Sequence, residues 1–129
     1  MSAYNLMING KLVAGDASMD VINPATEEVL ASCPRASKAQ LDQAVAAAKA
    51  AFPAWSKTPI EERKKAVAAI ADVLQANMQE LARLLTQEQG KPIKDATIEL
   101  FGASAFFRYF TSLDLPVQVL SDSPAGRVE

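Results

Sequence analysis

The segment Val21–Val29 constrains the fold of this chain more than any other stretch of its sequence. An apolar pair leads into Asn23-Pro24, and two glutamates then lead into a second apolar run. Asparagine before proline starts a turn, because proline fixes its own φ and keeps the preceding residue out of the helical region. We therefore predict two extended strands joined at a tight corner.

The rest of residues 1–34 is also predicted to form short strands. Asn9-Gly10 supplies the two positive-φ residues of a type I′ turn, which predicts a hairpin over residues 7–13. Further strands are predicted over residues 20–23 and 29–33. The first part of the chain is therefore expected to be a small set of strands.

Three amphipathic helices are predicted next. The first begins at Ser37, where Ser-x-x-Gln has the form of a capping box, and is broken near Pro53. The second begins at Thr58-Pro59, with threonine as the N-cap and proline at the first helical position, and ends at Gly90.

The third helix is predicted from about Pro92 to Ser112, with an apolar stripe wide enough to be buried on more than one side. Residues 117–120 are then predicted as a strand, residues 122–126 as a turn, and residue 127 as the start of another strand-like segment. The chain is thus expected to be cut at the opening of a strand. Its helices carry more apolar surface than a few short strands can cover, which predicts a missing sheet or a partner chain.

Composition excludes several classes of partner. The 129 residues include 13 basic and 15 acidic ones and carry a formal charge of −2, without the clustered basic face of a nucleic-acid-binding protein. No apolar run approaches the ~20 residues of a transmembrane helix. Cys33 is the single cysteine, which excludes an internal disulfide and favours a reducing, cytoplasmic setting.

The sequence also lacks the residues of the common catalytic sites. It contains no histidine, which excludes Ser-His-Asp and Cys-His catalysis and histidine-ligated metals. No two glycines stand in a phosphate-binding pattern. Glu27-Glu28, Glu61-Glu62 and Glu80 are better explained by helix-start electrostatics or solvent exposure than by acid–base catalysis.

Other conspicuous residues have structural interpretations. Cys33 is interpreted as a small buried side chain, and Gly90-Lys91-Pro92 as a helix end followed by a helix start. The aromatic residues are interpreted as core rather than as a cofactor platform; they are Trp55, Phe101, Phe106, Phe107 and Phe110.

Five short motifs follow one another along nearly the whole chain. They are Ile8-Asn9-Gly10-Lys11, Ile22-Asn23-Pro24-Ala25-Thr26, Ala44 to Phe52 with Trp55, Thr58 to Arg63, and Gln89-Gly90-Lys91-Pro92. In this order they resemble the amino-terminal portion of NAD(P)-dependent aldehyde dehydrogenases. Residues 122–129 resemble the segment that leads into the bridging hairpin of that family. The residues before Gly90 depart slightly from the Glu-Thr pair that the family often has there.

The resemblance implies an α/β fold, or α+β for the isolated fragment. Residues 1–129 would be part of a cofactor-binding domain, with strands over 1–34 and three helices over 37–113 that cover a Rossmann-like sheet, incomplete here. Residues 114–129 would start the bridging hairpin that reaches a neighbouring subunit. The expected partners are the rest of the dehydrogenase subunit or a homo-oligomer neighbour, with no nucleic acid and no membrane.

The resemblance also implies a reaction in which an aldehyde is oxidised to a carboxylic acid and NAD or NADP receives the hydride. The family's catalytic and cofactor-binding motifs would lie beyond Glu129. No catalytic or cofactor-binding residue is therefore assigned, and the chain alone is expected to bind no cofactor. Many members hold a structural monovalent cation, and the matching ligands here are the carbonyl of Ile22 and the carboxylate of Glu88. The alternative is that Glu88 faces solvent near a helix end.

Two hypotheses of function follow. The first is that the chain is the amino-terminal piece of an aldehyde dehydrogenase and is inactive alone, because it lacks the groups that would lower a reaction barrier by ~8 kcal/mol or more. The second is a stand-alone interaction module that docks through exposed apolar helices and an edge strand. A small helical ligand-binding protein is a third hypothesis, based only on the aromatic stripe.

Overall fold

A computed structural model describes residues 4–129 of the chain. It contains three hairpins and four helices, which confirms the predicted mixed α/β class. Residues 1–3 of the predicted strand range 1–34 lie outside the described residues. The strands are β1 (Leu6–Ile8), β2 (Lys11–Val13), β3 (Ala17–Ile22), β4 (Val29–Arg35), β5 (Ser121–Ser123) and β6 (Gly126–Val128). The helices are α1 (Lys38–Trp55), α2 (Ile60–Ala76), α3 (Met78–Gln89) and α4 (Ile93–Ser112).

Each strand pairs antiparallel with its neighbour in sequence, giving the pairs β1–β2, β3–β4 and β5–β6. The predicted Asn9-Gly10 turn joins the first pair, and both residues have positive φ, 52° and 71°. In the second pair the register shifts between Val21 and Ile22, immediately before the Asn-Pro turn. The hairpin predicted over residues 7–13 and the strands predicted over residues 20–23 and 29–33 are therefore confirmed, with β3 and β4 longer than expected.

Helix α1 begins as predicted. Ser37 and Gln40 form a complete capping box, in which each side chain accepts a hydrogen bond from the backbone N–H of the other residue. The helix continues through Pro53 to Trp55, whereas the sequence predicted a break near that proline. A proline removes one helical hydrogen bond, and here the loss falls in the last turn, where the helix is about to end.

The second predicted helix is divided in two. Asn77 leaves helical geometry with φ −107° and ψ 12°, and α3 starts at the next residue. Its side-chain Nδ2 donates to the carbonyl of Val73 at 2.8 Å and so satisfies the end of α2. The predicted N-cap Thr58 is also not observed, because its Oγ1 instead donates to the carbonyl of Ala54 in α1. The described part of the chain therefore has four helices where three were predicted.

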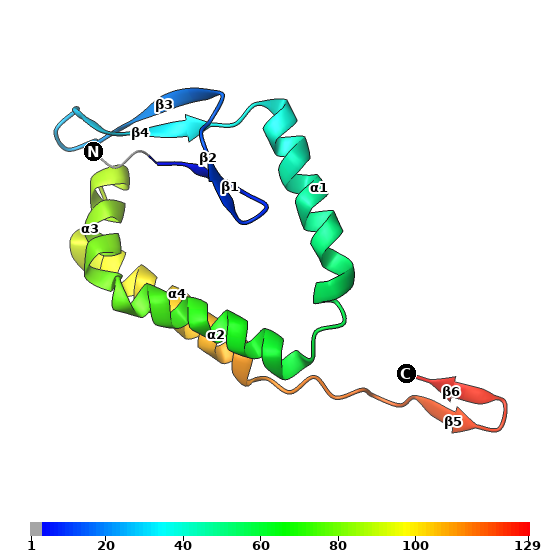
Figure 1. Ribbon diagram of the computed structural model, residues 1–129. Helices are drawn as coiled ribbons and strands as arrows, with labels where there is room; N and C mark the ends of the chain where they lie inside the picture. The colour runs from blue at the N-terminus through cyan, green and yellow to red at the C-terminus, as the bar shows by residue number, and fades with distance from the viewer. Residues whose placement is uncertain (1–3) are drawn as a thin grey trace.

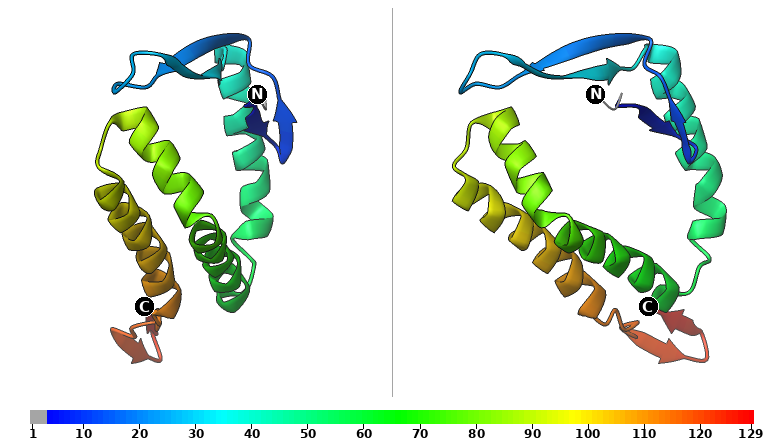
Figure 2. Two further views of the ribbon diagram at one scale, coloured as in Figure 1. Left: turned by 90° about the vertical axis from the view of Figure 1, so that its left-hand side faces the viewer. Right: turned by 60° about the vertical axis from the view of Figure 1, so that its left-hand side comes forward.

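Helices α2, α3 and α4 pack together through small side chains. Ala71, Ala82 and Ala96 are fully buried, and the buried Ser104 donates from Oγ to the carbonyl of Ala71 at 3.4 Å. Figure 2 shows α4 lying alongside α2 and α3, while α1 stands apart on the other side of the molecule. The small residues allow the helix axes to approach closely, and no large side chain in residues 4–129 is fully buried.

The predicted aromatic core is wrong for this chain. Trp55, Phe101, Phe106 and Phe110 are between 47% and 66% exposed, and Phe107 is half-buried. The accessible surface is 10034 Å², whereas a compact folded protein of this mass exposes about 6,600 Å². In Figure 1 the β1–β2 and β3–β4 hairpins, α1 and the α2–α3 pair follow one another around a ring, and many of the large apolar side chains of the chain remain exposed.

The carboxyl-terminal segment projects away from the helices (Figure 1). The strand predicted over residues 117–120 is not formed, because no other strand within residues 4–129 pairs with residues 117–119. Pairing begins where the backbone N–H of Leu120 donates to the carbonyl of Val128. The turn predicted within residues 122–126 is confirmed as the tip of the β5–β6 hairpin, and the strand-like segment predicted from residue 127 lies in β6.

No helix in the described part of the chain is both long enough and apolar enough to cross a membrane.

Candidate functional site

The turn between β3 and β4 is organised by Asn23. Its backbone carbonyl accepts hydrogen bonds from the N–H groups of Glu27 at 2.8 Å and Thr26 at 3.3 Å. Its side-chain Oδ1 accepts from the N–H of Ala25 at 3.0 Å, and its own N–H donates to the carbonyl of Glu28 at 2.9 Å. These four hydrogen bonds fix the corner that the Asn-Pro pair predicted.

The corner between α3 and α4 is fixed in a similar way. Gly90 has φ 73° and its N–H donates to the carbonyl of Thr86 at 2.8 Å, which ends α3 with a left-handed residue. The carbonyl of Pro92 accepts from the first turn of α4, and Lys91 forms an ion pair with Glu99 further along that helix. The predicted helix end at Gly90 and helix start at Pro92 are both confirmed.

The two corners touch. Pro24 Cγ lies only 2.9 Å from the point where a Cβ on Gly90 would stand, so only glycine allows this approach. Figure 1 shows the β3–β4 turn beside the end of α3. The structure thereby brings together the segments that carry the two predicted site residues, Ile22 at the end of β3 and Glu88 in the last turn of α3.

The donors available at this junction suit a hard cation. Ile22 offers a backbone carbonyl oxygen and Glu88 a carboxylate, and hard cations take oxygen ligands of these kinds. Glu88 is exposed and forms no ion pair or side-chain hydrogen bond within residues 4–129. Elsewhere in the same range no three His, Cys, Asp or Glu side chains are grouped as metal ligands. The assignment of Ile22 and Glu88 stays a prediction.

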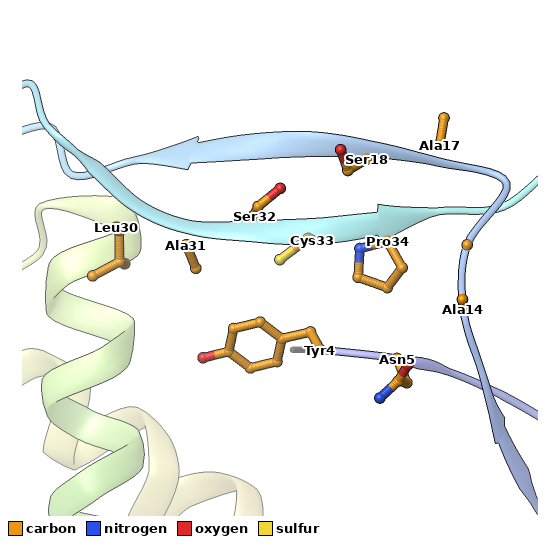
Figure 3. Close-up of a pocket in the computed structure, with 11 residues that line it drawn as sticks. Tyr4, Asn5, Ala14, Ala17, Ser18, Leu30, Ala31, Ser32, Cys33 and Pro34 are labelled. Atoms are coloured by element: carbon orange, nitrogen blue, oxygen red, sulfur yellow. The ribbon is translucent and has the colours of Figure 1, made fainter. Parts of the chain in front are cut away.

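A hollow of about 690 Å³ lies between β4 and Tyr4 and Asn5, the two described residues before β1. In Figure 3 the sulfur of Cys33 and the ring of Pro34 lie on the side of β4 that faces Tyr4, whereas Ser18 and Ser32 point to the opposite side. Cys33 is half-buried rather than buried as predicted. No basic side chain is among the residues that line this hollow.

One positioning side chain was missed by the sequence analysis. Besides capping α1, Gln40 donates from Nε2 to the carbonyl of Ala14 at 2.8 Å and accepts at Oε1 from the N–H of Asp16 at 3.2 Å. The amide thus ties the β2–β3 loop to the start of α1. The capping-box motif predicted the local contacts of Gln40, but nothing in the sequence indicated which distant loop would meet it.

Comparison with known proteins adds the following. The model of the family described as "Aldehyde dehydrogenase family" matches residues 12–119. A Pseudomonas sp protein described as "Probable aldehyde dehydrogenase" is 44% identical over 127 residues, covering 98% of this chain and 26% of that protein. The mitochondrial acylating methylmalonate-semialdehyde/malonate-semialdehyde dehydrogenase of Rattus norvegicus is 43% identical over 98 residues, covering 74% of this chain and 18% of the enzyme.

The fold has solved relatives as well. A point mutant of betaine aldehyde dehydrogenase from Staphylococcus aureus, in complex with NAD+, superposes with a TM-score of 0.88 at 30% identity. The match covers 95% of this chain and 26% of that one. This chain therefore spans about a quarter or less of the length of these relatives.

Proposed function

This chain belongs to the aldehyde dehydrogenase family, and from that membership we propose that it is the amino-terminal part of an NAD(P)-dependent enzyme that oxidises an aldehyde to a carboxylic acid. The observation that carries the proposal is the family match over residues 12–119. The NAD+ in the complex of the Staphylococcus aureus relative supports a nicotinamide cofactor, which would accept the hydride from the substrate.

We propose that the chain alone is inactive. It has no histidine, and its single thiol lies in a hollow without a basic neighbour. Within residues 4–129 no three His, Cys, Asp or Glu side chains are grouped as metal ligands, and the sequence has no phosphate-binding glycine pattern. Its contribution would be structural, in line with the large apolar side chains that its helices leave exposed.

The exposed apolar faces support a covering role for the helices. The accessible surface exceeds that of a compact protein of this mass by about half. Under this proposal residues 1–34 and 37–113 cover the sheet of the cofactor-binding domain, and residues 114–129 carry the hairpin that reaches a neighbouring subunit of the oligomer. The single cysteine supports a cytoplasmic setting.

We further propose a structural monovalent cation at the junction of the two corners, held by the Ile22 carbonyl, the Glu88 carboxylate and a ligand from outside this chain. The contact between Pro24 and Gly90 supports this assignment, because it draws the two donor segments together.

The test of the enzymatic proposal is aldehyde-dependent NADH or NADPH formation. The intact gene product, whose native mass is measured first, should reduce the cofactor when an aldehyde is added, and the purified 129-residue chain should not. Chromatographic identification of the product distinguishes a free acid from a thioester. Turnover by the 129-residue chain, or a native product of 13.8 kDa with no such activity, would contradict the proposal.

A further inference from the structure

The ring of Pro24 lies very close to the backbone of Gly90. A Cβ on residue 90 would stand 2.9 Å from Pro24 Cγ and 3.7 Å from Pro24 Cβ, so the proline ring rests on the glycine backbone. Gly90 also needs its positive φ of 73°, which side chains other than glycine rarely adopt. Two features of the geometry therefore require glycine at residue 90, namely the close approach of the proline ring and the positive φ.

Each side of this contact is rigidly connected to one candidate donor. Ile22 stands two residues before Pro24, and the four hydrogen bonds of Asn23 fix the backbone between them. Glu88 stands two residues before Gly90, whose N–H is held by the last turn of α3. Moving the proline relative to the glycine therefore moves the Ile22 carbonyl relative to the Glu88 backbone.

We infer that Pro24 and Gly90 are positioning residues for the cation: their contact sets the separation of the Ile22 carbonyl and the Glu88 carboxylate. This inference rests on the cation site proposed above. Neither residue has a side chain that can bind a cation, since Pro24 contributes its ring and Gly90 its lack of a side chain. The effect is specific because a cation is bound only where its oxygen donors converge within metal–ligand distance of one site.

The test measures cation-dependent thermal stabilisation of the intact gene product. Tm is recorded against NaCl or KCl, with choline chloride keeping the ionic strength constant. In Pro24→Ala the half-saturating cation concentration should rise about tenfold, the loss typical when a residue supporting the ligands is removed. Pro124→Ala is the matched control, because Pro124 also precedes an alanine in an exposed hairpin turn but lies in β5–β6.

The readout separates positioning from ordinary stability. If Pro24 had only a structural role, Pro24→Ala would lower Tm by the same amount in NaCl or KCl as in choline chloride. The half-saturating cation concentration would then be unchanged, and this result would overturn the inference. Glu88→Ala should abolish the cation-specific shift. If Glu88→Ala does so while Pro24→Ala keeps the original half-saturation, the site stands and the positioning role is refuted. If the unmodified protein shows no cation-specific shift, both the site and the inference fail.

A double substitution examines the contact directly. Gly90→Ala should lower Tm on its own, because the new methyl group meets the proline ring and the backbone is strained. In the Pro24→Ala background the same substitution should cost less, since the ring is gone and only the strain in φ remains. Additive losses would show that the two residues do not act on each other and would overturn the inference.

Discussion

At the scale of single residues, Gly15 shows how closely the loop between β2 and β3 packs against its neighbouring strands. A Cβ there would stand 2.8 Å from the carbonyl oxygen of Ala17, 2.8 Å from the backbone nitrogen of Arg35 and 2.9 Å from its carbonyl oxygen. All three are backbone atoms, which cannot rotate away as a side chain can. The loop between β2 and β3 therefore passes the end of β4 at a distance that only glycine permits.

We expect Gly15→Ala to destabilise the protein by about 1–3 kcal/mol, the range typical of overpacking. Gly102→Ala is the control, because no atom lies within 4 Å of the added methyl group and Gly102 is inside α4. That substitution should stabilise the helix by about 0.5–1 kcal/mol. Denaturant unfolding of the 129-residue chain, in which Gly102 has this open space, measures both, and equal effects of the two changes would contradict this account.

At the scale of elements, α2, α3 and α4 meet where their side chains are smallest. The contact is bordered by Arg108 of α4, whose Nη2 donates to Asp72 Oδ1 at 2.8 Å and to Gln75 Oε1 at 3.0 Å on α2. These polar contacts are exposed, and each contributes well under 1 kcal/mol in such settings. Close packing around Ala71 therefore stabilises the pairing of α2 with α4 more than these polar contacts do.

Enlarging this contact should be costly. Ala71→Leu would force α2 away from α4, because Ala71 has 0% exposure, and we expect a loss of about 1–3 kcal/mol. Ala69→Leu makes the same change at an exposed position of the same helix and should leave stability nearly unchanged. The prediction is checked by comparing the midpoints of urea unfolding of the Ala71→Leu and Ala69→Leu variants. A similar loss of stability in both variants would contradict the close packing of α2 against α4 at Ala71.

The elements were predictable from sequence to the extent that their signals are local. Asn9-Gly10 and the Ser37 capping box act within a few residues. The turn and the helix start that they predicted both lie where expected. The break at Asn77 was not predicted, because the apolar periodicity continues past this residue and does not show that its side-chain amide caps α2. An asparagine three residues before Glu80 does resemble a helix-start signal. Residues 117–119 have strand-like sequence but no partner strand within residues 4–129.

Burial and the candidate site were less predictable. Periodicity identified the apolar faces of the helices, but it cannot state what covers them, so the predicted core residues such as Phe101 are exposed. Ile22 and Glu88 came from a family resemblance rather than from spacing. The contact between Pro24 and Gly90 depends on how two distant turns pack, and no local pattern in either segment indicates it.

At the scale of the whole molecule, the large accessible surface predicts how the isolated chain behaves. We expect the purified 129-residue chain to bind a fluorescent dye specific for apolar surface and to unfold over a broad temperature range, because its faces lack a covering layer. The intact gene product should bind little dye per subunit and unfold sharply. Weak dye binding and a sharp transition for the short chain would contradict a covering role.

The pairing of every strand with its sequence neighbour has a consequence for synthesis on the ribosome. Pairing between strands that are adjacent in sequence closes only short loops, so it forms early. Each hairpin can therefore form in its native register before residues far along the chain have been synthesised. Translation adds about 5–20 residues per second, far slower than hairpin formation in microseconds. Under the proposed covering role, the elements of this chain can thus form while the rest of the cofactor-binding domain is still being made, and during that interval their apolar faces are available to chaperones.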